Sequence, residues 1–297
     1  MSATATRPRQ TRGSRRSRSS DRPRLTVGSW VVTIVLGLGC FVVLMPVIWM
    51  VLTSLKSPAE VFVMPPIWVF EPQWSNYPEV LQLVPFQRYI LNTATIVGLV
   101  MLGTLLSCSF CAYGFARLQA PGRNAIFMIL MATLMLPTTV TLVPTYIVFN
   151  YLGWVNTFKP LILPAFFGSA FFIFLFRQFF LGIPRELEEA ARIDGAGYLR
   201  IWWTIFLPLS WPVIATVSVF TFVAAYNDFF GPVIYLSDES KYTIAVALSY
   251  FSGSPRVGPQ VQLLMAATTI AALPSILVFL LAQRYFIKGI AVSGVSK

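Results

Sequence analysis

Long apolar runs dominate this sequence and restrict what it can fold into. Six runs hold a single charged residue between them: residues 30–55, 89–116, 124–150, 160–176, 209–235 and 261–283. A helix needs about 20 apolar residues to cross the hydrocarbon core, and a spanning segment must satisfy its own backbone hydrogen bonds. Only 11% of the residues are charged, against roughly 25% in soluble domains. The sequence therefore predicts an all-α, polytopic membrane protein with six transmembrane helices.

The basic residues between these runs are distributed unevenly. If the N-terminus lies inside the cell, 17 lysines and arginines fall in segments on the inner side and 5 in segments on the outer side. Cytoplasmic loops of membrane proteins carry this excess of positive charge. We therefore expect both termini to be cytoplasmic.

The first residues form an arginine-rich tail. Residues 7–24 contain eight arginines and one acidic residue, Asp21. Such a tail can bind nucleic acid, but this one has no aromatic residues and no soluble domain follows it, so we expect no nucleic-acid partner. Residues 1–28 are predicted to be a disordered cytoplasmic tail that orients the first helix, and residues 29–297 to be the transmembrane domain.

Residue types that usually carry catalysis are scarce. The chain has no histidine, which excludes a Ser-His-Asp triad and a histidine zinc site. Cys108 and Cys111 have the C-x-x-C spacing of some redox and metal sites, but they lie in an apolar run, where packing between helices is the better interpretation. A Walker A motif is also absent. We expect no enzymatic activity and no cofactor bound by this chain.

Prolines interrupt the third run around three threonines. Pro137 precedes Thr138, Thr139 and Thr141, and a proline kinks a helix because it lacks a backbone donor. Broken helices often line the solute pathways of transporters. These threonines are candidate pathway residues, with interhelical packing as an equal alternative.

The charged residue within the runs is Asp228, which follows Asn227 near the outer end of the fifth run. Charges placed inside a membrane are costly and tend to be functional. Asn227 and Asp228 are therefore also candidate pathway residues, although at this depth Asp228 could be solvated or could cap a helix.

The connector at residues 183–208 is unusual for a loop between two spans. Pro184 can start a helix, and acidic residues follow in its first turns, where they favour the positive end of the helix dipole. Gly195 permits a left-handed stop. A second, apolar helix is predicted over 198–206, ending at Pro208. The small side chains of Ala190 and Ala191 allow another protein to approach closely.

The spacing in this connector resembles the EAA signature of ABC importer permeases. The matching residues are Glu189, Ala190, Ala191, Gly195, Ile205, Leu207 and Pro208. In that family the loop docks into a cleft on a separate ATPase subunit. The resemblance implies that these residues, together with Asp194, couple the chain to an ATPase.

The likeness extends over nearly the whole chain after residue 30 and is strongest to the second permease of maltose-type sugar importers. Matching features include the Thr-Ser-Leu-Lys run at 53–56, the Asn-Tyr pair at 76–77 and the Tyr-Asn-Asp run at 226–228. The family commonly has tryptophan where this chain has Tyr226.

The resemblance implies a permease subunit of an ATP-driven carbohydrate importer in the bacterial cell membrane. Its implied partners are a second homologous permease, two ATPase subunits that bind ATP and magnesium, an extracytoplasmic solute-binding protein and the sugar itself.

Three alternatives stay open at this point. The solute could be glycerol phosphate or another polar molecule, because such importers share this architecture. An ion-coupled secondary transporter would need acidic or histidine residues at mid-depth, and none is evident. A membrane scaffold without transport function would leave the signature spacing to chance.

Overall fold

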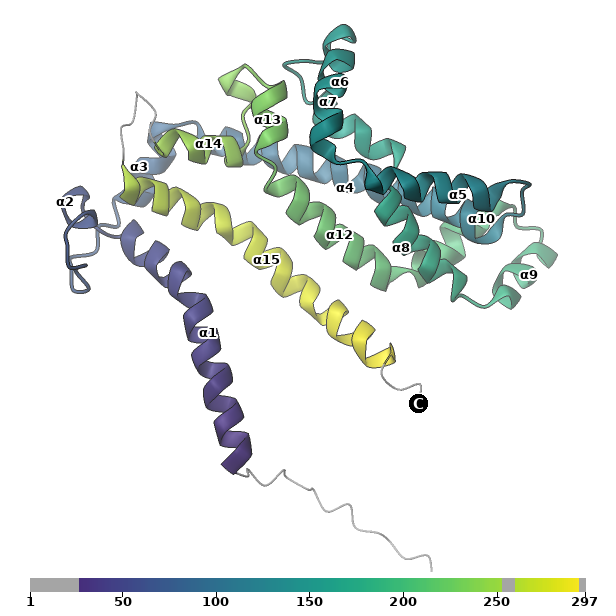
Figure 1. Cartoon of the computed structure of the whole chain (residues 1–297), viewed down its shortest axis with the longest axis horizontal. Coiled ribbons are helices and arrows are strands. Elements are labelled where there is room, and N and C mark those ends of the chain that lie inside the picture. The colour runs from purple at the N-terminus through teal and green to yellow at the C-terminus, as the bar shows by residue number, and fades with distance from the viewer. Residues whose placement is uncertain (1–26, 253–259, 294–297) are drawn as a thin grey trace, which may run out of the picture. The chain divides into compact units, whose positions relative to one another are not determined.

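The computed structural model describes residues 27–252 and 260–293, and every regular element in those ranges is a helix (Figure 1). The predicted all-α class is confirmed. The chain divides into two compact units, Met1–Ile48 and Trp49–Lys297, which we describe separately. The first contains most of helix α1 (Val27–Ser54), the predicted first span. Apart from the first two residues of α1, the predicted tail lies outside the described residues.

Within the described ranges, four segments are long and apolar enough to cross a bilayer: Trp30–Ser54, Phe86–Arg117, Lys159–Leu181 and Val261–Gln283. Two further pairs of helices qualify if each bent pair is one span: Arg123–Met135 with Thr139–Tyr151, and Tyr198–Leu209 with Trp211–Tyr226. These segments overlap the six predicted runs, so the expected number of spans is reached only when both bent pairs are included.

The third run is broken where its proline predicts a break. Helix α5 (Arg123–Ala132) continues into the 3₁₀ turn η1 (Thr133–Met135), and helix α6 (Thr138–Tyr151) starts directly after Pro137. The two halves are bent by 102°. Pro144 lies inside α6 without ending it.

The fifth run differs from the single helix predicted over 209–235. Helix α12 (Trp211–Tyr226) ends at Tyr226, and helix α13 (Phe230–Tyr235) is separate. On the predicted inner side, α10 (Tyr198–Ile201), the π-helical turn η3 (Trp202–Phe206) and α11 (Leu207–Leu209) follow one another without a gap. The chain then bends by 80° before α12. The predicted stop at Pro208 therefore falls one residue early.

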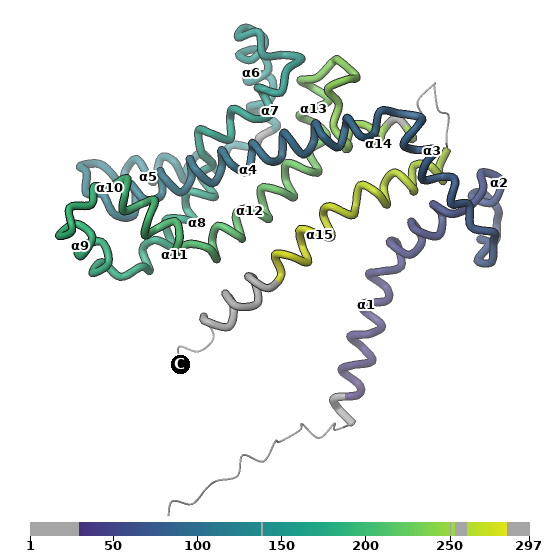
Figure 2. Tube along the Cα trace, turned by 180° about the vertical axis from the view of Figure 1, so that it is seen from behind, coloured from purple at the N-terminus to yellow at the C-terminus, as the bar shows by residue number. Residues whose placement is uncertain are grey.

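Helix α4 (Phe86–Arg117) packs against α8 (Ala170–Leu181) and α12, and the three run side by side in Figure 2. Helix α8 completes the fourth span together with α7 (Lys159–Ile162) and the 3₁₀ turn η2 (Leu163–Phe167). Buried side chains between these helices include Cys108, Tyr113, Phe176, Phe180, Phe206 and Val217. Cys108 lies among them as a free thiol, which confirms its predicted packing role.

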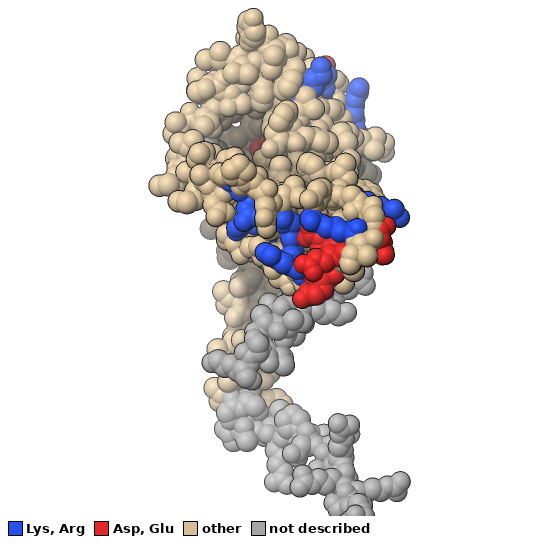
Figure 3. Space-filling view, turned by 90° about the vertical axis from the view of Figure 1, so that its right-hand side faces the viewer, with Lys and Arg blue, Asp and Glu red and all other residues tan. Residues whose placement is uncertain are grey.

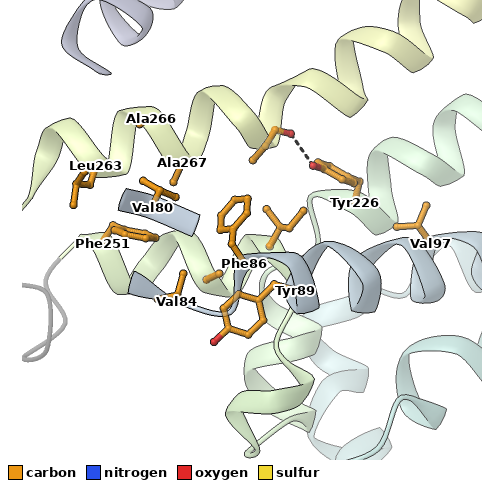
Figure 4. Close-up of a cluster of buried hydrophobic side chains, with 13 residues drawn as sticks. Val80, Val84, Phe86, Tyr89, Val97, Tyr226, Phe251, Leu263, Ala266 and Ala267 are labelled. Carbon is orange, nitrogen blue, oxygen red and sulfur yellow. Dashed lines mark hydrogen bonds between the residues drawn. The ribbon is translucent and has the colours of Figure 1, made fainter. Parts of the chain in front are cut away.

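A second buried cluster lies at the opposite end of α4, where Phe86 and Tyr89 meet Val80 of α3 (Asn76–Leu83) (Figure 4). Helices α14 (Ile244–Phe251) and α15 (Val261–Ser293) complete it. Here the Tyr226 hydroxyl donates a 2.7 Å hydrogen bond to the Ala271 carbonyl. This bond ties the end of α12 to α15, directly before Asn227 and Asp228.

The Thr-Ser-Leu-Lys run at 53–56 and the Asn-Tyr pair at 76–77 form one clasp. The Asn76 amide donates to the carbonyls of Ser54 and Lys56, at 2.8 and 3.0 Å, and the hydroxyls of Ser54 and Tyr77 lie 2.8 Å apart. Lys56 is only 3% exposed, and its ammonium lies 4.9 Å from the Trp49 ring centroid. The clasp fixes the turn from α1 into the predicted outer loop, which also contains the short helix α2 (Pro58–Val61).

The connectors predicted to share a side of the membrane do lie together. On the predicted outer side, the Asn156 carboxamide oxygen accepts from the amides of Ser237 and Asp238, at 3.2 and 3.0 Å. Asp238 caps the 3₁₀ turn η4 (Glu239–Lys241) through the Ser240 amide. At the other end, residues 116–123 and 185–192 line one cavity. The grouping of the loops agrees with the grouping predicted from their charges.

Candidate functional site

Helix α9 (Arg185–Ile193) forms the predicted first helix of the connector. Pro184 precedes it in an extended conformation, and Glu186 and Glu188 lie in its first turn. The fixed φ of proline and the negative charges near the exposed N–H groups both favour a helix start here.

The end of α9 is a Schellman turn at Gly195, as the predicted left-handed stop requires. The Gly195 amide bonds to the Arg192 carbonyl at 3.0 Å, and the Ala196 amide bonds to the Ala191 carbonyl at 2.9 Å. Gly195 has φ +81°, a conformation that side chains with a Cβ disfavour. The space that a Cβ would occupy at Gly195 has no neighbouring atom within 4 Å, so a substitution there strains the backbone without a clash.

An ion pair within α9 involves an arginine that also contacts the helix that follows. Glu188 is 6% exposed, and its carboxylate accepts a 2.6 Å hydrogen bond from Arg192. The Arg192 guanidinium lies 4.7 Å from the ring centroid of Tyr198 in α10. Burial alone lowers the pKa of Arg192, but the hydrogen bond and charge of Glu188 outweigh it and raise that pKa above its ordinary value. Arg192 therefore stays charged and keeps both contacts.

Arg117, the last residue of α4, braces the start of the connector. Its Nη2 donates to the Phe180 carbonyl at 2.5 Å and also to the Ile183 carbonyl. The same guanidinium lies 5.0 Å from the Phe206 ring centroid. One side chain thus links the end of α8, the entry to α9 and the π-helical turn. Nothing in the sequence pattern had predicted this role for Arg117.

Arginines and acids meet in a cavity of about 310 Å³ behind α9. Its charged lining residues are Arg117, Arg123, Arg185, Arg192, Glu188 and Glu189. In Figure 3, basic and acidic side chains gather in one band at this end of the molecule, beneath a surface that is almost free of charge.

The opposite face of α9 is an exposed stripe of small and apolar residues. Leu187 and Ala190 lie on it, and Ile193 is 87% exposed. Asp194 and Gly195 are exposed at its end. Ala191 is half-buried, because it packs inward on the core around Phe206. The predicted small-residue surface is therefore made by Ala190 and its exposed apolar neighbours, whereas Ala191 supports it from behind.

The remaining signature residues lie away from that stripe. Ile205 and Leu207 are half-buried and pack on the same core as Phe206. Pro208 is exposed and lines an apolar groove with Trp203 and Trp211. These residues form the link between α9 and α12.

The predicted pathway residues are not brought together. Thr139 and Thr141 are exposed at the start of α6, and Thr138 starts that helix. The side-chain amide of Asn227 donates to the Val223 carbonyl of α12 at 2.9 Å. Of this group, Asp228 lines a cavity within the bundle.

That cavity has a volume of about 320 Å³ and lies among α4, α8, α12 and α13. Four buried threonines line it with Asp228: Thr93, Thr104, Thr221 and Thr243. The sequence did not predict any of the four. Thr93, Thr104 and Thr221 lie within apolar runs, where a threonine commonly bonds its own helix and carries no signal of a site, and Thr243 lies in a loop between two runs.

Within the described ranges, no group of three or more histidine, cysteine, aspartate or glutamate side chains is placed to hold a metal ion. The acidic residues of these ranges lie apart from one another: in and directly after α9, beside the cavity that Asp228 lines, and in the loops.

Comparison with known proteins shows which family this chain belongs to. The family described as "Binding-protein-dependent transport system inner membrane component" matches residues 109–292, which include the whole connector. The chain belongs to this permease family. It is a multi-pass protein of the bacterial inner membrane and a transport subunit, not an enzyme.

Relatives of the permease extend the match over most of its length. It is 34% identical to a probable ABC transporter permease, YurM, of Bacillus subtilis, over 91% of this chain and 90% of the relative. It is 32% identical to the sn-glycerol-3-phosphate transport system permease UgpE of Yersinia pestis, over 86% and 94%.

A solved structure confirms the architecture of the permease. A chain from a bacterial ABC transporter that imports the acidic polysaccharide alginate superposes with a TM-score of 0.75 at 25% identity, covering 88% of this chain and 96% of that chain. Together these similarities place the permease in an ABC importer of the maltose-type carbohydrate family.

Proposed function

We propose that the exposed stripe of α9 is the surface through which a separate ATPase drives this permease. The observation that carries the proposal is the contrast between the two faces of α9. One face is exposed and apolar around Ile193, whereas the other is fixed by Glu188, Arg192 and Arg117. A surface that must transmit force needs free access on one side and rigid support on the other.

The path from this surface into the membrane is a continuous chain of helices. Movement of α9 passes through the turn at Gly195 to α10, η3 and α11, and then through the bend at Ser210 to α12. The Ser210 hydroxyl is buried and donates to the Phe206 carbonyl at 2.5 Å, which joins the two sides of the bend. Helix α12 ends next to Asp228, so displacement of α9 reaches the cavity in the bundle.

The energy for this movement comes from partner subunits in our proposal. Two ATPase subunits bind ATP and magnesium, because this chain has no Walker A motif. A second, homologous permease completes the pathway, and an extracytoplasmic solute-binding protein delivers the solute to the outer loops. The family description, which names dependence on a binding protein, supports the last partner.

The experiment compares two glycines with the same backbone requirement. Gly195 and Gly153 have φ of +81° and +65°, and both have open space where a Cβ would lie. Gly153 lies in the connector after α6, on the predicted outer side. We expect Gly195→Asp to abolish ATP-driven solute uptake and Gly153→Asp to retain it, with both proteins inserted in the membrane at wild-type levels.

Wild-type uptake by Gly195→Asp contradicts the coupling role of this turn. Uptake that persists in proteoliposomes without any ATPase subunit contradicts the ATP-driven mechanism as a whole and favours ion coupling.

A further inference from the structure

The cavity behind α9 contains more positive charge than its acidic residues neutralise. It is lined by four arginines and two glutamates. Glu188 is paired with Arg192 at 2.6 Å, and among the described residues no ion pair includes any of the other three arginines. The second acid, Glu189, is exposed, so water and salt screen its charge. A cavity of about 310 Å³ therefore carries uncompensated positive charge.

The three arginines without an acidic partner differ in how many of their donors are used. Arg117 and Arg123 donate to the carbonyls of Phe180 and Leu118, at 2.5 and 2.8 Å, and these neutral partners leave both positive charges in place. Arg185 is exposed, and within the described ranges its guanidinium has neither a hydrogen bond nor an ion pair. A guanidinium presents its N–H donors in a planar fork that fits a phosphate or a carboxylate. Arg185 therefore offers a free and accessible fork, with two further positive charges in the same wall.

The same cavity borders an apolar surface of the kind that faces lipid. Arg123 lines the cavity and is also the first residue of α5. In the next turns of α5, Ile126, Met128 and Ile129 are largely exposed, and α5 belongs to one of the bent pairs that could cross a bilayer. Figure 3 shows the charged band next to a surface that is almost free of charge. The arginines therefore lie where lipid headgroups meet the hydrocarbon, on the predicted inner side.

Three kinds of anion could bind Arg185: an acidic side chain of a partner protein, a free phosphate and a lipid phosphate. A protein that covers the exposed stripe of α9 contacts Ala190 and Ile193, on the face away from the cavity. A free phosphate would use the guanidinium and leave the apolar surface of α5 uncovered. An anionic phospholipid uses both, and basic pockets beside transmembrane helices on the cytoplasmic side suit such headgroups. The arrangement therefore favours a lipid.

We propose that the cavity behind α9 binds the phosphate of an anionic phospholipid, that Arg185 donates to the phosphate oxygens, and that the acyl chains lie along α5. The charges of Arg117 and Arg123 stabilise the phosphate from the same wall. The proposal goes beyond the proposed function, because lipid binding does not require that an ATPase drives α9. A bound lipid would connect α9 to α5 across the cavity and add support behind α9.

The first test measures lipid affinity in the importer, purified with its partner subunits in a neutral detergent. Short-chain phosphatidylglycerol and phosphatidylcholine are titrated against it, and their dissociation constants are compared. We expect phosphatidylglycerol to bind more tightly. Arg185→Gln should raise the dissociation constant of phosphatidylglycerol about fivefold, because one basic group is lost, and leave that of phosphatidylcholine unchanged.

Arg200→Gln is the matched control for Arg185→Gln. Arg200 of α10 is also exposed and has no ion pair among the described residues, but it does not line the cavity. The control removes the same charge from the same connector, so the affinity for phosphatidylglycerol should change by less than about twofold. Equal losses in the two variants would show a general attraction of lipid to a basic surface and would overturn the proposed site.

The second test locates the lipid and needs no change at Arg185. Gln119 lines the cavity and is exposed. Gln119→Cys is introduced after the three native cysteines are replaced by alanine, and its reaction with a soluble thiol reagent is followed in the importer and in the permease stripped of ATPase. We expect phosphatidylglycerol to slow the reaction several-fold in both, and phosphatidylcholine and inorganic phosphate to leave the rate unchanged.

Three further results overturn the proposal. Protection of Gln119→Cys by inorganic phosphate as strong as by phosphatidylglycerol identifies a free anion as the ligand. Protection by the ATPase subunits, with none by phosphatidylglycerol in their absence, identifies the cavity as part of a protein interface. An unchanged affinity for phosphatidylglycerol in Arg185→Gln shows that Arg185 does not hold the phosphate. None of these measurements uses ATP hydrolysis, so a failure of lipid binding and a failure of the coupling role of α9 are distinguishable.

Discussion

The site around α9, formed by residues 116–123 and 185–192, and the cavity beside Asp228 differ in how their polar groups are paired. The site around α9 is made of charges from two short stretches, residues 117–123 and 185–192, and its buried acid, Glu188, has a charged partner in Arg192. The cavity is lined mainly by apolar side chains from separate helices, together with Asp228 and four buried threonines. A site that transmits force must be satisfied and rigid on its own, and among the described residues the cavity beside Asp228 contains no such ion pair.

This comparison predicts that substitutions at the two sites fail differently. Changes behind α9 should reduce ATP-driven turnover for every solute alike. Changes in the cavity should alter which solute is accepted and leave ATP hydrolysis by the importer intact. In both places, the effect should be largest where a buried group loses its position or its partner.

The largest effect is expected from Arg117→Met. Two backbone carbonyls, of Phe180 and Ile183, lose the donor that they share. An unsatisfied buried acceptor costs about 1–3 kcal/mol, and we expect uptake to fall at least about tenfold for every solute. Uptake and membrane insertion are measured together.

Arg123→Met is the matched control for Arg117→Met. Its guanidinium donates to one carbonyl, that of Leu118, at 2.8 Å within its own loop. If both variants lost the same share of uptake, the positive charge near α9 would matter and the hydrogen bonds of Arg117 to Phe180 and Ile183 would not.

Gly231→Ala tests the role of the cavity beside Asp228. The added Cβ displaces the Asp228 carboxylate, which lies 2.4 Å from its position. We expect uptake of a neutral sugar to fall several-fold, about as far as in Asp228→Asn, with ATPase activity unchanged. Gly98→Ala on α4 is the control, since nothing lies within 4 Å of the added atom. A loss of ATPase activity in Gly231→Ala would mean that the cavity and the coupling surface are not separate.

A smaller effect is expected for the pair of Glu188 and Arg192. Arg192 is partly exposed, so the coupling between the two side chains should be small but measurable, as for other ion pairs at a protein surface. The measurement is a double-mutant cycle with Glu188→Gln and Arg192→Met, read from thermal unfolding of the purified permease. Fully additive losses would contradict the proposed support of α9 by this pair.

The smallest effect on transport is expected from Tyr226→Phe. The variant loses one hydrogen bond to the Ala271 carbonyl, worth about 1 kcal/mol, while the ring keeps its packing. The midpoint of thermal unfolding should fall, and uptake should change by less than about twofold. A large loss of uptake would place Tyr226 in the solute pathway.

The sequence predicted the α9 end well because its signals are local. Pro184, the acids of the first turn and Gly195 follow one another within a short stretch, and each acts through backbone geometry or the helix dipole. The break at Pro137 was predicted for the same reason. Hydrophobic runs likewise located the spans, since length and apolarity are read directly.

What the sequence did not predict depends on contacts between distant residues. The brace from Arg117 reaches carbonyls 63 and 66 positions away. The Thr93 hydroxyl accepts from the Ile244 amide at the start of α14, 151 residues away. The 80° bend after Leu209 and the end of α12 at Tyr226 depend on packing and not on a breaker residue alone.

The central claim is that α9 faces the cytoplasm and is covered by an ATPase. The most direct measurement is the reaction of Ile193→Cys, in a background without native cysteines, with a membrane-impermeant thiol reagent. Our account predicts reaction in inside-out vesicles stripped of ATPase, protection when the ATPase is restored, and no reaction in intact cells. Labelling in intact cells, or equal labelling with and without the ATPase, would contradict it.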